Sequence, residues 1–184
     1  MPRLSKEDYI KIYKKYNAKR VWSFSRIETY KQDKYEYFLK YVKKIPGDRQ
    51  DSAYAPYGTL VHDIIENFYN KQIKLEDIQN EFDKKSLELE MLGKKFDRTD
   101  DLKNEKIKTD YEACVKDCLN CLVPPQVPFK TELPVVVDIA QGVVLIGYID
   151  LIEIDKGKIT ITDFKTSTIY SKTDMQNKVI QLML

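Results

Sequence analysis

The sequence predicts an α+β protein in which an N-terminal helical region is followed by a mainly antiparallel sheet. Up to residue 123 the apolar residues recur at helical spacing, and from about residue 130 they form runs that suit strands. At 184 residues with 42% apolar content, the chain is expected to form a single domain. Residues 1–123 would form a mostly helical lobe, and residues 130–184 would form the sheet and a last helix.

Five helices are predicted in the first part of the chain, over about 5–16, 25–42, 58 onward, 75–92 and 101–122. The second is expected to open at a capping box, Ser25-Arg26-Ile27-Glu28. The third follows Gly58-Thr59, which places His62 in its first turn. Its apolar stripe consists of Val61, Ile64, Ile65 and Phe68.

Three strands are predicted at about 132–139, 143–154 and 158–164, before a last helix from about Thr173. The second and third strands are joined by Asp155-Lys156-Gly157-Lys158, which indicates a hairpin. A two-residue loop pairs Asp155 with Lys158 and Ile152 with Ile161, so apolar residues face each other. A three-residue loop with a bulge at Gly157 would shift this pairing by one residue, and the isoleucine match argues against it.

The same register sets Asp150 directly opposite Asp163. Side chains at such positions have Cβ atoms ~5 Å apart, and like charges there are destabilising unless something offsets them. A divalent cation would do so. Lys165 follows Asp163 by two residues, so strand alternation returns it to the same face beside the expected metal.

Two further side chains are candidates for this metal site. His62 lies off the apolar stripe of its helix, and an imidazole can complete a site that is otherwise made of carboxylates. A structural role for this lone histidine is the alternative. Glu132, at the start of the first strand, could reach the metal if that strand pairs alongside residues 143–154, or it could be an exposed strand-end carboxylate.

The three cysteines, Cys114, Cys118 and Cys121, have the spacing C-x3-C-x2-C, which some iron–sulfur enzymes use. In those enzymes the cysteines lie on a loop, whereas here the segment is predicted to be helical. On a helix the three residues form one stripe, which we expect to be buried, since cysteine is among the most buried residue types. We therefore expect neither an iron–sulfur cluster nor a disulfide.

Charge is distributed unevenly along the chain. Residues 1–50 hold 14 Lys and Arg against 6 Asp and Glu, with seven tyrosines among them, although the whole chain has a net charge of only +2. Such a segment could follow a phosphate backbone and stack bases, or it could be a solvated helix face with tyrosines packed on the core. Neither a membrane span nor a signal-peptide core is visible, so we expect a cytoplasmic protein, or one of the host cytoplasm if the source is a virus.

Taken together, these motifs resemble the PD-(D/E)XK nuclease superfamily, and within it the RecB-like exonucleases, including the CRISPR-associated ones. Most of the chain takes part in the resemblance, beginning with an opening helix after Ser23-Phe24-Ser25. The matching segments that follow are Gly58-Thr59-Leu60-Val61-His62, Gly147-Tyr148-Ile149-Asp150, Asp163-Phe164-Lys165-Thr166 and Gln181-Leu182. The resemblance implies a restriction-endonuclease-like αβββα core.

It also implies roles for particular residues. His62, Asp150 and Asp163 would bind Mg²⁺ or Mn²⁺ together with the backbone carbonyl of Phe164. Lys165 would orient the attacking water and help to deprotonate it. Gln181 would help to hold Lys165 and the DNA end.

The chain departs from the family pattern in two places. Gln32-Asp33-Lys34 stands where many relatives carry Cys-Pro, which agrees with the expectation that the chain holds no iron–sulfur cluster. The sequence stops at Leu184, one residue before the tyrosine of the Q-x-x-x-Y motif, so we expect it to be a fragment that lacks a C-terminal segment.

The expected function is that of a metal-dependent DNA nuclease, an exonuclease acting in recombination or repair. One alternative is an RNA endonuclease, because viral cap-snatching enzymes use a similar set of histidine, acidic and lysine residues. The other is a module that has lost activity and binds nucleic acid or docks to a protein partner. The intact Asp150, Asp163 and Lys165 argue against this last possibility.

Overall fold

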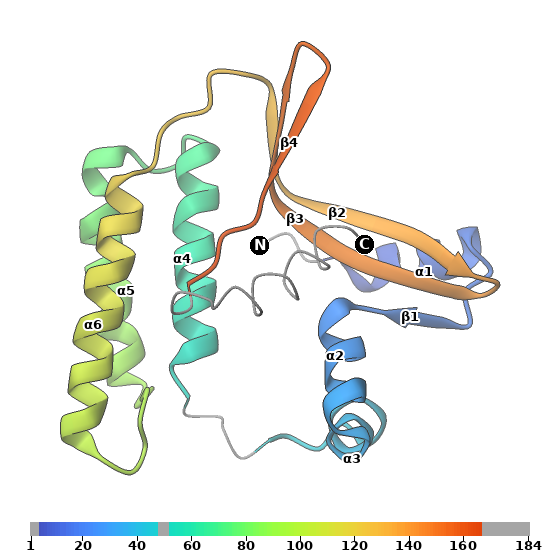
Figure 1. Cartoon of the computed structure of the whole chain (residues 1–184), viewed down its shortest axis with the longest axis horizontal. Coiled ribbons are helices and arrows are strands. Elements are labelled where there is room, and N and C mark those ends of the chain that lie inside the picture. The colour runs from blue at the N-terminus through green and yellow to red at the C-terminus, as the bar shows by residue number, and fades with distance from the viewer. Residues whose placement is uncertain (1–3, 48–51, 167–184) are drawn as a thin grey trace. The chain divides into compact units, whose positions relative to one another are not determined.

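The computed structural model describes residues 4–47 and 52–166, which divide into two compact units (Figure 1). Within the described residues, the first unit contains 4–47 and 132–149, and the second contains 52–131 and 150–166. Both units draw on the same long strand, β3 (Val143–Asp155), because the division falls between residues 149 and 150. Each unit has its own hydrophobic core.

The first unit opens with helix α1 (Lys6–Lys15), which agrees with the predicted helix over 5–16. Ser5 caps it through a capping box with Asp8, since each side chain bonds the backbone N–H of the other residue. The core of this unit joins α1 to the sheet through the buried residues Ile12, Val21, Val144 and Ile146.

The second predicted helix is interrupted in the structure. Helix α2 (Phe24–Gln32) is capped by Ser23, so the proposed capping box at Ser25 is wrong. The helix ends at Asp33, whose carboxylate accepts hydrogen bonds from the backbone N–H groups of Tyr35 and Glu36 and so caps α3 (Lys34–Tyr37). A π-helical segment, η1 (Phe38–Lys43), follows directly. Asp33 competes successfully for these donors because a short acidic side chain is a good N-cap.

The second unit is built on three helices, α4 (Tyr54–Tyr69), α5 (Ile78–Met91) and α6 (Asp101–Asn120), with a short 3₁₀ turn η2 (Leu75–Asp77) before α5. The three helices lie side by side in Figure 1. Their core contains the predicted stripe of α4. It also contains Tyr57, Phe82 and Leu119, and each of these three residues is at most 1% exposed. Within the described residues, none of the helices is long and apolar enough to cross a membrane.

Helix α4 begins earlier than the sequence predicts. Its first residue is Tyr54, so His62 lies in the middle of the helix and not in its first turn. The apolar residues Tyr54 and Tyr57 extend the pattern backwards through Pro56, which is tolerated because it lies in the first turn of the helix. Gly58 is therefore an interior residue of the helix.

The four described strands form one mixed sheet in the order β1–β3–β2, with β4 also paired to β3. Strands β2 (Phe129–Ala140), β3 and β4 (Lys158–Thr162) correspond to the three predicted strands. Strand β1 (Arg20–Trp22) was not predicted, since three residues carry too little periodicity, and it pairs in parallel with β3. The α+β prediction is confirmed, with one parallel pair in the sheet. The last helix that we expect from Thr173 lies outside the described residues.

The cysteines are not buried as the stripe predicts. All three are exposed and free. The residues of α6 that do reach the core are Val115 and Leu119, each one position beyond a cysteine. The buried face of the helix is therefore rotated by one residue from the stripe that we expect.

Candidate metal centre

The β3–β4 hairpin has the register that the sequence predicts. Asp155 pairs with Lys158, Ile154 with Ile159, and Ile152 with Ile161. The two-residue loop is confirmed by positive φ angles of 47° at Lys156 and 85° at Gly157, the backbone geometry of a type I′ turn. The apolar pairs near the turn are nevertheless exposed, because Ile154 and Ile159 retain 48% and 60% of their surface.

The ladder ends just before the predicted pair of aspartates. Its last pair is Leu151 with Thr162, and β4 ends there, so Asp163 lies beyond the strand. The Asp150 carboxylate instead accepts a hydrogen bond of 2.7 Å from the backbone N–H of Phe164. Asp150 and Asp163 thus stand one position beyond the last ladder pair, at the same end of the hairpin, and are not themselves a pair of the ladder.

Asp150 is largely covered, with a side chain only 11% exposed. Burial raises the pKa of this carboxyl above its ordinary value, and the nearby charge of Asp163 acts in the same direction. The hydrogen bond from Phe164 and the nearby His62 and Lys165 lower the pKa, but burial has the largest effect. An ionised Asp150 is thus held where negative charge is unfavourable.

His62 approaches Asp150 from helix α4. Its Nδ1 atom lies 3.6 Å from Oδ1 of Asp150, and 19% of its side chain is exposed. The flanking residue Val61 is buried in the core, so the imidazole projects from the side of the helix. The structure therefore brings together the histidine and the first aspartate that the sequence singled out.

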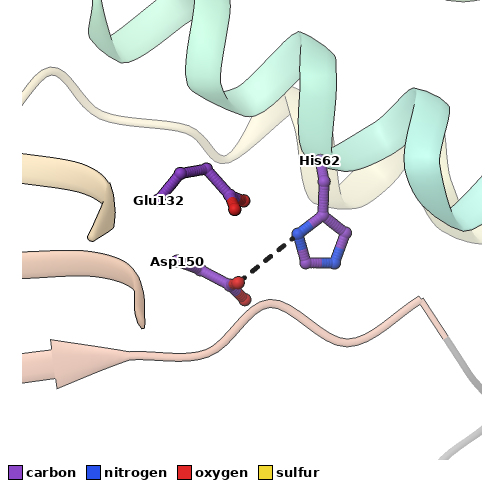
Figure 2. Close-up of side chains that lie close together, drawn as sticks. All are labelled: His62, Glu132 and Asp150. Carbon is purple, nitrogen blue, oxygen red and sulfur yellow. Dashed lines mark ion pairs between the residues drawn. The ribbon is translucent and has the colours of Figure 1, made fainter. Parts of the chain in front are cut away.

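Glu132 joins this pair. It stands where the chain passes from the second unit to the first, directly after Thr131. One ligand atom from each of Glu132, His62 and Asp150 can be chosen so that all lie within 4.8 Å of one another. Figure 2 shows both carboxylates beside the imidazole ring. Glu132 is 6% exposed, so the alternative of an exposed strand-end carboxylate is wrong.

The backbone of Glu132 is unusual for a strand residue. Its φ angle is 47°, in the left-handed region that a side chain with a Cβ rarely adopts. Such a conformation costs on the order of 1–3 kcal/mol and persists only where the surrounding structure enforces it. The local sequence contains no glycine that would mark a bulge here, and this feature of the site had no signal in the sequence.

Asp163 and Lys165 form an ion pair at the end of the hairpin. The ammonium nitrogen of Lys165 lies 2.6 Å from Oδ2 and 2.7 Å from Oδ1 of Asp163. The side chain of Lys165 is 34% exposed and that of Asp163 is 20% exposed. The lysine therefore remains accessible to a ligand, while the aspartate orients it.

The residues between and beside this ion pair are fixed by packing. The ring of Phe164 stacks on Tyr69 of α4, with centroids 6.3 Å apart, and packs against the core of the second unit. Thr166 lies against Gly58, where an added Cβ would be 3.4 Å from the threonine hydroxyl oxygen. Helix α4 thus supports the segment that carries Lys165 on both sides. Gln181 lies outside the described residues.

The donor set suits a hard divalent cation. Buried Glu132 and partly buried Asp150 lie within a few ångströms of the imidazole, so negative charge predominates in this group, and a cation would offset it. Mn²⁺ accepts carboxylate oxygens together with an imidazole nitrogen. Mg²⁺ prefers the carboxylate oxygens of such a set. The residues present therefore fit such a metal.

A candidate cation site of this kind, with a lysine nearby, is typical of phosphodiester-hydrolysing enzymes that use divalent metals. A family model described as the PD-(D/E)XK nuclease superfamily matches residues 21–184. The chain belongs to the PD-(D/E)XK nuclease superfamily. Searches of curated proteins and of solved structures gave no match.

Proposed function

We propose that this protein is a Mg²⁺- or Mn²⁺-dependent nuclease of the RecB-like type that degrades DNA from its ends in recombination or repair. The observation that carries this proposal is that one hairpin holds both the largely covered Asp150, which lies beside His62, and the Asp163–Lys165 ion pair. The order of the motifs along the chain supports the RecB-like subtype. We also propose that both compact units belong to one nuclease domain.

His62, Asp150 and Asp163, with the carbonyl of Phe164, are the proposed ligands, and Glu132 is a further one. A bound divalent cation would offset charge on the phosphate and lower the pKa of a water molecule. Lys165 would orient the attacking water and help to take its proton. Asp163 supports that role because its carboxylate lies 2.6 Å from the lysine ammonium and so sets its position. Gln181 would complete the site near the DNA end.

The reaction itself tests the proposal. Asp163→Ala and Lys165→Ala are each expected to lower Mn²⁺-dependent degradation of end-labelled DNA by about 10²-fold or more, since both act on the reacting groups. DNA binding should survive in both variants. Lys158→Ala, which changes an exposed lysine of the same hairpin, serves as the matched control.

The products distinguish the related possibilities. Release of mononucleotides from a labelled end supports an exonuclease, whereas internal fragments contradict it. Degradation of RNA but not of DNA would favour the RNA endonuclease. Unchanged degradation in both alanine variants would exclude the proposed mechanism. Binding without hydrolysis at millimolar Mn²⁺ would favour a module that has lost activity.

A further inference from the structure

In the first unit, one helical stretch has no buried residue. None of the residues of α2, α3 and η1, which follow each other from Phe24 to Lys43, is buried. A surface helix normally places an apolar stripe against a core. Here that stripe is aromatic, and its rings pack mainly on each other.

The aromatic cluster is continuous. Trp22 stacks on Tyr37, with centroids 5.6 Å apart and ring planes at 15° to each other. Tyr30 meets Tyr37 edge to face, with ring centroids 5.2 Å apart, and the ring centroid of Tyr41 lies 5.3 Å from that of Tyr37. Such contacts hold the rings in place without a supporting core.

Basic side chains lie over the same rings. The guanidinium of Arg26 is 4.9 Å from the centroid of Tyr41, and the ammonium groups of Lys34 and Lys43 are 5.7 Å and 5.5 Å from Tyr30 and Phe38. Residues 20–47 hold seven Lys and Arg against three Asp and Glu. The face that the rings form is therefore positively charged.

Several rings remain open to a ligand. Tyr35 is 69% exposed, Tyr30 is 44% exposed and Phe38 is 40% exposed. Exposed apolar rings with charged side chains beside them are typical of an interaction site. The π-helical turns of η1, which are rare and occur frequently at functional sites, lie within the same stretch.

We propose that the rings of this stretch form an aromatic face that binds single-stranded DNA. It consists of the packed cluster of Trp22, Tyr30, Tyr37 and Tyr41. The exposed rings of Tyr35 and Phe38, on the same helical stretch, complete it. The basic side chains attract the phosphates, and the open rings stack on bases. A duplex hides its base faces within its own stack, so the exposed rings would have no use there, and only an unpaired strand matches both features. This inference rests on the proposed function in one respect, that the bound strand is the substrate.

Binding is tested on the intact chain with a fluorescent oligothymidine in EDTA, where no hydrolysis can occur. Tyr35→Ala and the double variant Tyr35→Ala/Phe38→Ala are expected to weaken binding by about tenfold or more for each ring, the usual effect of losing one stacked base. Tyr35→Phe should restore the affinity, since it keeps the ring. Lys34→Gln should reduce the salt dependence of binding. Affinity for a blunt duplex should change little in the ring variants.

Tyr13→Ala is the matched control. This tyrosine belongs to α1 of the same unit, lies outside the aromatic face and is 41% exposed, close to the 44% of Tyr30 and the 40% of Phe38. It should leave the affinity unchanged. Thermal unfolding of each variant checks that the fold is kept, and Tyr35→Ala is the safest because its ring is the most exposed of the face.

Four results would overturn the inference. The first is unchanged affinity for the oligothymidine in folded Tyr35→Ala and in the double variant, and the second is an equal loss of affinity for the duplex. The third is tighter binding of an oligouridine than of the oligothymidine. The fourth is a loss of affinity together with a loss of folding that Tyr35→Phe does not restore. Asp163→Ala separates this inference from the proposed function, because it should remove hydrolysis and keep binding. Ring-dependent binding in a chain that hydrolyses no nucleic acid would leave the aromatic face supported and the nuclease proposal refuted.

Discussion

At the scale of single residues, Asp150 shows how a site can be costly to the fold. Its carboxylate is nearly buried, and burial together with the charge of Asp163 raises its pKa. One hydrogen bond from Phe164 and the neighbouring His62 offset part of this cost. The presence of a carboxylate that destabilises the metal-free protein in this way is explained if its negative charge is needed to bind a ligand.

The first prediction concerns Asp150→Asn. The folded state holds the proton on Asp150 to higher pH than the unfolded chain does, so the stability of the metal-free protein falls as pH rises from the unfolded pKa of ~3.9 through the folded value. The amide removes this ionisation and can still accept from Phe164. We expect Asp150→Asn to be at least as stable as the wild type at pH 7 in EDTA and to lack hydrolysis.

Urea unfolding at pH 4 to 8 measures this effect. Asp155→Asn, at the exposed turn of the same strand, is the control and should behave as the wild type in both assays. A clear loss of stability in Asp150→Asn at pH 7 would show that the ionised carboxylate stabilises the fold, contrary to the argument from burial.

At the scale of elements, α4 and the end of the hairpin act together. The helix supplies His62 on its side, the ring of Tyr69 under Phe164, and open space at Gly58 for Thr166. Gly58 is useful here because it lacks a side chain. No special backbone angle is involved, since it lies inside a regular helix.

The second prediction tests this close approach. In Gly58→Ala the new Cβ would lie 3.4 Å from the Thr166 hydroxyl oxygen, which is ordinary contact, so activity should stay within about twofold and stability should rise by up to ~1 kcal/mol. In Gly58→Val the added methyl groups would push Thr166 and the neighbouring Lys165. Activity should then fall by about tenfold or more, because small displacements of reacting groups are costly.

Initial rates of DNA degradation and thermal unfolding of the two variants measure this difference. Gly47→Val is the control, since an added Cβ there meets nothing within 4 Å. Equal activity of the valine and alanine variants would mean that Gly58 does not position the lysine.

At the scale of the whole molecule, the metal should couple to folding. A cation that binds only the folded protein stabilises it by about 2.7 kcal/mol at a concentration 100 times its dissociation constant. For a chain of this length that corresponds to a rise in melting temperature of roughly 5–10 °C. Acidic groups that repel each other in the metal-free state make this effect expected.

The third prediction is therefore a rise of this size in the melting temperature when Mn²⁺ replaces EDTA. The rise should disappear in His62→Ala, Glu132→Gln and Asp150→Asn, each of which removes one proposed ligand. Lys158→Ala should keep it. A rise that persists in all three ligand variants would place the metal elsewhere.

Much of this molecule could be predicted because it depends on spacing along a short stretch of chain. The stripe of α4 and the register of the β3–β4 hairpin follow from helical period and turn length. The hairpin alone brings Asp150 to the same end as Asp163 and Lys165. Local periodicity thus determined three of the candidate site residues and their order.

Other features depended on contacts between distant segments. Periodicity could not show which face of α6 is buried, and the cysteine stripe that it suggested is exposed. It also gave no sign of the parallel strand β1, which exists only through its partner β3.

By itself, the sequence determined the proposed type of chemistry: two aspartates, a lysine and a histidine in a spacing that a helix and a hairpin convert into a candidate site. Only the tertiary structure decided that Glu132 is buried beside His62 and Asp150, with a strained backbone. It also decided that the Asp150 carboxylate accepts a hydrogen bond from the backbone N–H of Phe164. The physical reason is that burial and backbone strain at one residue are imposed by neighbours far away in the sequence, whereas period and turn type are imposed by neighbours a few residues away.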